Sequence, residues 1–222
     1  MSRICVLAPH PDDEILGVGG TLLKARARGD EVFVVIMTKA YPPLWTEEVI
    51  AEKRKEALAA AAALGAADVF FLDFPTLHLS SRPAIEVNAK VGALVQDLRA
   101  EVLYAPQMND INSDHRATFE AAFVAARPHP GCTVRALYSY ETVSTTRLNH
   151  HDTGWYPNVY EDITHWIDEK IRILSIYRTE MGEFPHTRSL ESVRMFARER
   201  GLAVGMAYAE AMMLVREYRR PE

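Results

Sequence analysis

The chain has 222 residues, of which 48% are apolar and 25% are charged, and its formal net charge is −5. This length fits one large domain, and we expect a single domain over residues 1–222. The acidic balance gives no electrostatic reason for a nucleic-acid or membrane-surface partner. The two cysteines, Cys5 and Cys132, form neither a disulfide framework nor a paired metal spacing.

We expect no targeting signal at the N-terminus or in the apolar runs. The N-terminus has one basic residue, Arg3, before a short apolar run, which does not match a signal peptide. The longest apolar stretch, residues 57–67, is too short and too rich in alanine to cross a bilayer. We therefore expect a soluble cytoplasmic protein without a membrane span.

The predicted elements alternate between short apolar strands and helices. The strands are expected at residues 3–8, 31–38, 68–72, 101–105 and 135–141, and the helices at residues 13–28, 46–64, 84–100 and 115–126. Gly65 follows the second helix at the usual place for a left-handed C-terminal residue. Such alternation is typical of an α/β fold with a parallel sheet covered on both faces.

The pattern changes after Glu141. Residues 142–157 are polar and aperiodic, and a loop of this length is usually a functional lid or a disordered connector. Helices are predicted at residues 163–181, 190–200 and 204–216, so the C-terminal part is expected to be helical.

Acids and histidines follow two of the predicted strands. His10, Asp12 and Asp13 follow the first strand, and Asp114 and His115 follow the fourth. Parallel sheets bind ligands beyond the carboxyl ends of their strands. Two imidazoles and one carboxylate with an open fourth position are the usual protein ligands of a catalytic zinc. His10, Asp13 and His115 offer these groups, and Asp12 is then a spare carboxylate that can take a proton from metal-activated water.

Simpler interpretations of the same residues stay open. Acids in a first helical turn favour the helix dipole without any metal. A lone histidine such as His115 is more often a surface or internally bonded residue than a ligand. Gly17, Gly19 and Gly20 lie inside the predicted helix, which favours close packing of helix on sheet over a nucleotide-binding loop.

The segment PHPDDEILGVGG resembles the signature of the zinc-dependent N-acetylglucosamine deacetylases of the PIG-L/LmbE-like superfamily. NDINSDHRATFEAA is similar to the second motif of these proteins, and EFPHTRSLE and AYAEAM are similar to their C-terminal motifs. The resemblance runs from residue 4 to about residue 216. It implies a Rossmann-like three-layer sandwich with a mostly parallel sheet.

The resemblance also implies a reaction. One zinc ion per chain would be held by His10, Asp13 and His115, although other divalent metals stay open, and Asp12 would be the general base. The implied reaction is hydrolysis of the acetamide of an N-acetylglucosamine-type amino sugar or its conjugate. The expected partner is therefore a small amino-sugar molecule. Many relatives assemble, so a homo-oligomer stays open.

The chain departs from this family at one position. Many members carry a second histidine three residues before the ligand histidine, and here that residue is Asn112. An amide can donate a hydrogen bond to an oxyanion, but it cannot transfer a proton at neutral pH. Either Asp12 performs both proton steps or another residue contributes. His186 is the candidate for that residue, against the alternative of a surface histidine.

Candidates for substrate binding rest on weaker signals. The resemblance places an arginine in the KRKEA run, where Arg54 is the candidate, against the alternative of a solvated helix face. Arg188 is a candidate for binding sugar hydroxyls or phosphate, and Asp114 is expected beside the substrate. Trp155 and Tyr156 are expected either to stack on a sugar ring or to anchor the long loop on the core.

Two other functions fit parts of this pattern. Two histidines and one carboxylate also form the iron site of non-haem oxygenases, but those enzymes carry it on an all-β barrel, which the alternating pattern contradicts. A catalytically inactive or regulatory sugar- or metal-binding member of the fold is the second alternative, and Asn112 is the residue that motivates it.

Overall fold

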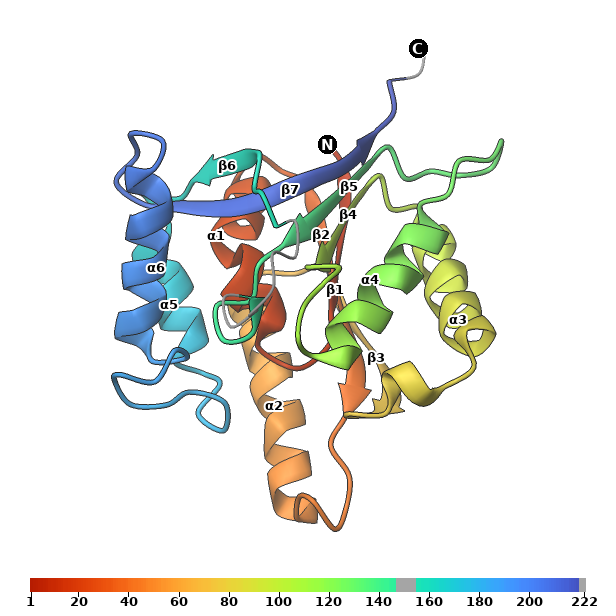
Figure 1. Ribbon diagram of the computed structural model, residues 1–222, viewed down its shortest axis with the longest axis horizontal. Coiled ribbons are helices and arrows are strands. Elements are labelled where there is room, and N and C mark those ends of the chain that lie inside the picture. The colour runs from red at the N-terminus through yellow and green to blue at the C-terminus, as the bar shows by residue number, and fades with distance from the viewer. Residues whose placement is uncertain (147–154, 220–222) are drawn as a thin grey trace.

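The protein is described here by a computed structural model that covers residues 1–146 and 155–219, and in these residues seven strands form one sheet (Figure 1). The strands are β1 (Arg3–Ala8), β2 (Glu31–Lys39), β3 (Asp68–Pro75), β4 (Val102–Pro106), β5 (Ala136–Tyr140), β6 (Val159–Asp162) and β7 (Ala209–Glu217). Their spatial order is β3-β2-β1-β4-β5-β7-β6. Strands β1 to β5 are parallel, whereas β7 runs antiparallel to both β5 and β6. The predicted α/β fold with a mostly parallel sheet is confirmed.

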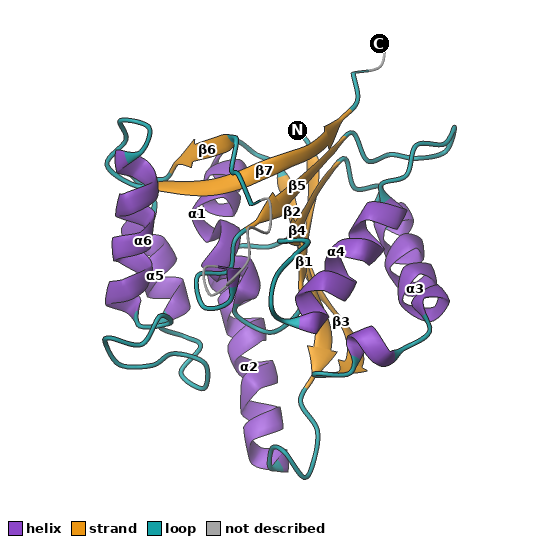
Figure 2. Cartoon of the chain, in the orientation of Figure 1, coloured by secondary structure: helices purple, strands orange, loops and turns teal. Residues whose placement is uncertain are grey.

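Helices cover both faces of this sheet, which gives three layers (Figure 2). One face packs against α1 (Asp13–Ala27), α2 (Glu47–Leu64), α5 (Ile167–Leu174) and α6 (Leu190–Leu202). The other face packs against α3 (Ala84–Asp97), α4 (Ser113–Ala125) and a short 3-10 turn at Leu79–Ser81. Figure 1 shows these two groups of helices on opposite sides of the strands.

After its first residue, the central strand β1 is apolar throughout because both of its faces are buried. Ile4 and Val6 belong to the core on the α1 side, whereas Cys5 and Leu7 belong to the core on the α3 side. Successive side chains of a strand point to opposite faces, and both faces of this sheet are covered. The continuous apolar run therefore follows from the three-layer arrangement, and Cys5 within it is a buried free thiol.

The glycines of α1 permit close packing, as predicted. A Cβ atom on Gly17 would overlap the ring of Tyr140 in β5, and one on Gly20 would lie 2.6 Å from Ile163. Gly65 ends α2 in the left-handed conformation with φ 72°, also as predicted.

The prediction of a last helix at residues 204–216 is wrong. This segment forms β7, which lies between β5 and β6 and pairs with both. Its Ala, Glu, Met and Leu residues favour a helix locally, but sheet pairing and burial of Ala209, Ala211 and Met212 outweigh that preference. The predicted helix at residues 163–181 is also shorter, since α5 covers Ile167–Leu174, and β6 was not predicted.

In the described part of the chain, no helix has the length and apolar character that crossing a membrane requires.

Candidate active site and metal centre

The site lies where the connections of the sheet diverge. Strands β1 and β4 are neighbours, but the helices that follow them, α1 and α4, cover opposite faces. The loop after β1 carries His10, and the first turn of α4 carries His115. Such a switch point leaves a crevice beyond the strand ends, which is where open α/β sheets bind ligands.

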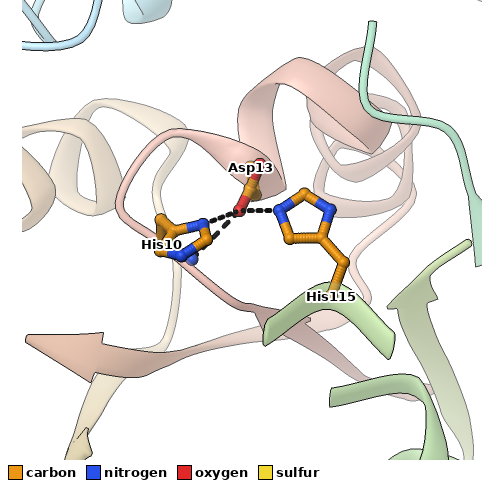
Figure 3. A group of neighbouring side chains, drawn as sticks. All are labelled: His10, Asp13 and His115. Atoms are coloured by element: carbon orange, nitrogen blue, oxygen red, sulfur yellow. Dashed lines mark hydrogen bonds and ion pairs between the residues drawn. The ribbon is translucent and has the colours of Figure 1, made fainter. Parts of the chain in front are cut away.

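Three of the predicted residues meet at this point (Figure 3). The Oδ2 atom of Asp13, on the first turn of α1, lies 3.1 Å from Nδ1 of His10 and 3.3 Å from Nε2 of His115. One candidate ligand atom from each residue lies within 4.8 Å of the other two. Two nitrogens and one carboxylate oxygen this close together are a donor set that suits zinc.

The second nitrogen of His10 faces a buried carboxylate. Nε2 of His10 lies 3.1 Å from Oδ2 of Asp114, and Asp114 also accepts hydrogen bonds from the backbone amides of Leu77 and Leu79. Asp114 was expected beside the substrate, but it is fully buried behind His10, and it does not line the cavity of the site. A carboxylate in this place fixes the ring orientation of a metal-binding histidine.

His115 also faces a buried carboxylate, that of Asp110, but without a hydrogen bond to it. Nδ1 of His115 lies 3.4 Å from Oδ2 of Asp110, and the same oxygen accepts hydrogen bonds of 2.8 Å from the hydroxyls of Thr145 and Thr146. These threonines belong to the start of the long loop at residues 142–157, of which residues 147–154 lie outside the described residues. The described start of this loop therefore packs on the outer side of the histidine cluster.

The charges of the cluster shift its pKa values in opposite directions. Burial by itself would raise the pKa of Asp13, but His115 and His10 hold it well below the usual range. Burial would lower the pKa of His115, but the charge of Asp13 and contacts with Asp110 raise it to about 10. The cluster thus holds a positive charge between carboxylates, and a divalent cation could take the place of that proton. The residues present therefore fit a metal ion.

The other two acids of the first motif have separate environments. Asp12 has a left-handed backbone with φ 110°, and its amide donates a 3.3 Å hydrogen bond to Oε2 of Glu14. Burial and the charge of Asp13 raise the pKa of Asp12 well above its usual value, although Arg188 opposes this. Glu14 also accepts a hydrogen bond from the hydroxyl of Tyr177, and burial raises the pKa of Glu14 to about 7.

A cavity of about 200 Å³ opens beside the cluster. Four of the predicted residues line it: His10, Arg54, Asn112 and Arg188. Its other walls include apolar and charged side chains such as Trp45, Ile50, Lys53, Phe71, Asp73 and Glu180.

Asn112 caps a helix in addition to lining the cavity. It is the N-cap of α4, and its Oδ1 accepts a 2.9 Å hydrogen bond from the amide of Asp114. Asparagine is among the best N-cap residues, which accounts for this residue type at the start of the helix. Its NH₂ group is the part of the side chain that this cap does not use.

Several predicted residues lie away from the cavity wall. His186 is exposed, and its Nδ1 accepts a 3.1 Å hydrogen bond from the amide of Arg188. Trp155 is half-buried and Tyr156 is 65% exposed, and neither lines the cavity. Asp12 is buried and does not line the cavity, but Arg188 does, and Nη1 of Arg188 lies 3.3 Å from Oδ2 of Asp12.

Arg54 is held in the wall by two contacts. Its Nη1 lies 2.9 Å from Oδ1 of Asp73, and its guanidinium lies 3.9 Å from the centre of the Phe71 ring. The side chain of Arg54 is still 42% exposed, so this residue lies on the cavity wall and also at the solvent-facing surface of α2.

Sequence reasoning assigned no role to Asp110 or Glu180. Asp110 lies in the NDINSDH segment, and its position after a strand was a usable signal. Glu180 had no such signal, because its contact with Arg188 depends on the path of the chain after α5.

The comparison with known families gives one match. The family PIG-L, described as GlcNAc-PI de-N-acetylase, matches residues 5–126. Two related proteins are the uncharacterized deacetylase YaiS of Escherichia coli (strain K12) and a probable N-acetyl-alpha-D-glucosaminyl L-malate deacetylase 2 of Bacillus anthracis. The first is 26% identical over 72% of this chain and 81% of its own length, and the second is 23% identical over 81% and 82%.

Solved structures share the whole fold. The conserved protein TT1542 from Thermus thermophilus is 26% identical, with a TM-score of 0.79 over 100% of this chain and 98% of its own. An N,N'-diacetylchitobiose deacetylase from Pyrococcus horikoshii is 22% identical, with a TM-score of 0.78 over 97% and 84%. GalB, a 4-carboxy-2-hydroxymuconate hydratase from Pseudomonas putida KT2440, is 21% identical, with a TM-score of 0.77 over 100% and 99%. The matches as a group support an enzyme of the deacetylase type, while the hydratase shows that the fold alone does not decide the reaction.

Proposed function

Because the chain belongs to the PIG-L family of GlcNAc-PI de-N-acetylases, we propose that it is a zinc-dependent hydrolase. Its substrate is an N-acetylglucosamine-type amino sugar or a conjugate of one, from which it releases acetate. The observation that carries this proposal is the cluster of His10, Asp13 and His115 beside a cavity. All three residues lie within the region that matches the family, and we take residues 1–222 as one catalytic domain.

His10, Asp13 and His115 would hold the metal, with Asp114 and Asp110 facing the two histidines. When bound, zinc supplies a Lewis acid for a carbonyl and lowers the pKa of water from about 15.7 to about 7. The hydrogen bond to Asp114 would keep the ring of His10 in one orientation, whereas Asp110 acts on the ring of His115 through its charge at 3.4 Å.

Asp12 is the general base in this proposal. It is adjacent to Asp13 but is not one of the three candidate ligands, so its carboxylate can accept a proton from water. The same carboxyl can then pass the proton to the amine that leaves. Burial and the charge of Asp13 raise the pKa of Asp12, which makes its carboxylate a stronger base than an ordinary aspartate.

Asn112 is the donor to the acetyl carbonyl oxygen as negative charge develops on it. The supporting observations are its place in the cavity wall and its NH₂ group, which the helix cap leaves free to donate. Arg54 and Arg188 offer hydrogen-bond donors to sugar hydroxyls in the same cavity. Trp155 and Tyr156 keep their two expected roles, stacking on a sugar ring or anchoring the long loop on the core.

A panel of N-acetylated amino sugars, free and conjugated, tests the proposal through acetate release by the metal-depleted and the zinc-loaded protein. We expect zinc-dependent acetate release from at least one compound. Asp12→Asn should keep its zinc and lose about 10²–10⁴-fold in rate. Asp97→Asn, a change of an exposed carboxylate at the end of α3, is the matched control and should leave the rate unchanged.

Three results would contradict the proposal. Zinc binding without acetate release from any compound would favour an inactive or regulatory member of the fold. Addition of water to an unsaturated acid in place of amide hydrolysis would favour a hydratase. Near-normal turnover by Asp12→Asn would remove Asp12 from the role of base.

A further inference from the structure

A chain of four charged side chains leads from α2 to Asp12. Nη1 of Arg188 lies 3.3 Å from Oδ2 of Asp12 and 3.2 Å from Oε2 of Glu180. The other oxygen of Glu180 pairs with the ammonium group of Lys53 on α2. The side chains of Lys53 and Glu180 are only 14% and 12% exposed, so solvent screens these contacts weakly.

Local hydrogen bonds place Arg188 in this chain. The amide of Gly182 donates to the carbonyl of Arg188 at 3.4 Å, and the amide of Arg188 donates to Nδ1 of His186. Ser189, the next residue, is the N-cap of α6, where its hydroxyl accepts from the amide of Ser192. The backbone is thus held on both sides of Arg188, and its side chain both lines the cavity and donates a hydrogen bond to Asp12.

Asp12 depends on this arginine for its orientation. The Asp13 carboxylate is occupied by the two histidines, and Glu14 is occupied by Tyr177 and the amide of Asp12. In the described part of the chain, the one side chain found to donate a hydrogen bond to the Asp12 carboxylate is Arg188. Without it, repulsion from Asp13 and Glu14 would favour rotation of the Asp12 carboxylate away from the place it now occupies.

We propose that Arg188 is a positioning residue that holds the Asp12 carboxylate in the orientation from which it accepts a proton. Glu180 and Lys53 fix the guanidinium in turn. This inference rests on the proposed function, in which Asp12 is the base. It differs from a substrate-binding role for Arg188, because a positioning residue acts on the proton step and leaves substrate affinity nearly unchanged.

Kinetics of three variants test this assignment. Arg188→Ala should lower kcat by about 10²-fold, the typical cost of misplacing a reacting group by about 1 Å, with little change in KM. Guanidinium chloride at a low, non-denaturing concentration should restore part of the kcat of Arg188→Ala, and Arg188→Lys should be less impaired. Arg178→Ala is the matched control, since Arg178 is a 77% exposed arginine ten residues away, and its kinetics should equal those of the wild type.

A measurement without substrate tests the same point. Crystal structures of the zinc-loaded wild type and Arg188→Ala should show the Asp12 carboxylate turned to a new position in the variant. An unmoved carboxylate would overturn the inference. So would unchanged kinetics in Arg188→Ala, or a raised KM with an unchanged kcat, which would make Arg188 a substrate ligand. If the wild type releases no acetate from any compound, the proposed function fails, whereas the crystallographic comparison still decides the role of Arg188.

Discussion

Three consecutive acids, Asp12, Asp13 and Glu14, are tolerated because each has a different partner. Asp13 faces two histidines, Asp12 faces Arg188, and Glu14 accepts from Tyr177 and from the amide of Asp12. The hydrogen bond that the Asp12 amide donates to Glu14 also supports the left-handed backbone of Asp12, a conformation that costs energy in a residue with a side chain. At the scale of residues, each of the three acids in the first motif therefore has its own set of contacts.

Asn112 combines a helix cap with a proposed catalytic donor, and a substitution can separate the two. Serine is an equally good N-cap but has no carboxamide NH₂. We expect Asn112→Ser to keep the stability of the wild type and to lose about 10²–10³-fold in kcat.

Urea unfolding and acetate release measure these two quantities. Asn112→Ala is the comparison, since it should lose the same activity and, in addition, about 1 kcal/mol of stability with the cap. A wild-type rate in Asn112→Ser would show that Asn112 is only a cap.

At the scale of elements, α1 has a kink, and backbone groups beside the kink form hydrogen bonds with side chains from distant parts of the chain. Val18 has non-helical angles, φ −136° and ψ 19°. The amides of Gly20 and Thr21 donate to the carboxylate of Glu210 on β7. Lys170 of α5 pairs with Glu210 at 2.7 Å and also donates to the carbonyl of Leu16. Glu210, the glutamate of the AYAEAM segment, thus stabilises the kinked helix α1, which carries Asp13.

Gly17 tests the close packing of α1 on the sheet. Gly17→Ala would force a methyl group into the ring of Tyr140, and overpacking of this kind costs about 1–3 kcal/mol. Gly92→Ala in α3 is the control, because a Cβ atom there meets nothing within 4 Å. That change should leave stability unchanged or raise it by about 0.5–1 kcal/mol. The urea unfolding midpoints of both variants measure the difference, and equal midpoints would contradict the packing argument.

The buried pair of Lys170 and Glu210 should contribute to stability only as a pair. Lys170→Met leaves a buried carboxylate without its cation, which should cost about 3–5 kcal/mol in the free energy of unfolding. Arg172→Met on the same helix breaks an exposed pair with Glu169 and should change stability little, because solvent screens that pair. Chemical denaturation of the two variants compares them, and similar losses would mean that solvent reaches Lys170.

At the scale of the whole molecule, the candidate ligands come from segments more than a hundred residues apart. The order of the sheet places β1 beside β4, and the connections after them diverge. The cluster of His10, Asp13 and His115 therefore exists only in the folded chain, and a metal bound there should stabilise the fold.

Zinc should raise the unfolding temperature of the wild type. At a free zinc concentration about 100 times the dissociation constant, binding to the folded state alone is worth about 2.7 kcal/mol. His115→Ala should lose this shift, while His165→Ala, a change of an exposed histidine, should keep it. Thermal unfolding with and without zinc measures the shift. An equal shift in His115→Ala would place the stabilising zinc elsewhere.

The layers of the sheet and the candidate ligands could be predicted from the amino-acid sequence. Apolar runs such as residues 3–8 indicate strands covered on both faces, and His10, Asp13 and His115 stand directly after two of these strands. These signals are local, because burial on both sides shows in every residue of a strand and a strand end is visible in the sequence. The folded chain was needed to show that residues 209–217 are a strand and that Arg188, not His186, lines the cavity. Both outcomes depend on contacts between distant segments, namely pairing of β7 with β5 and β6 and the hydrogen bonds around Arg188, which outweigh local preferences.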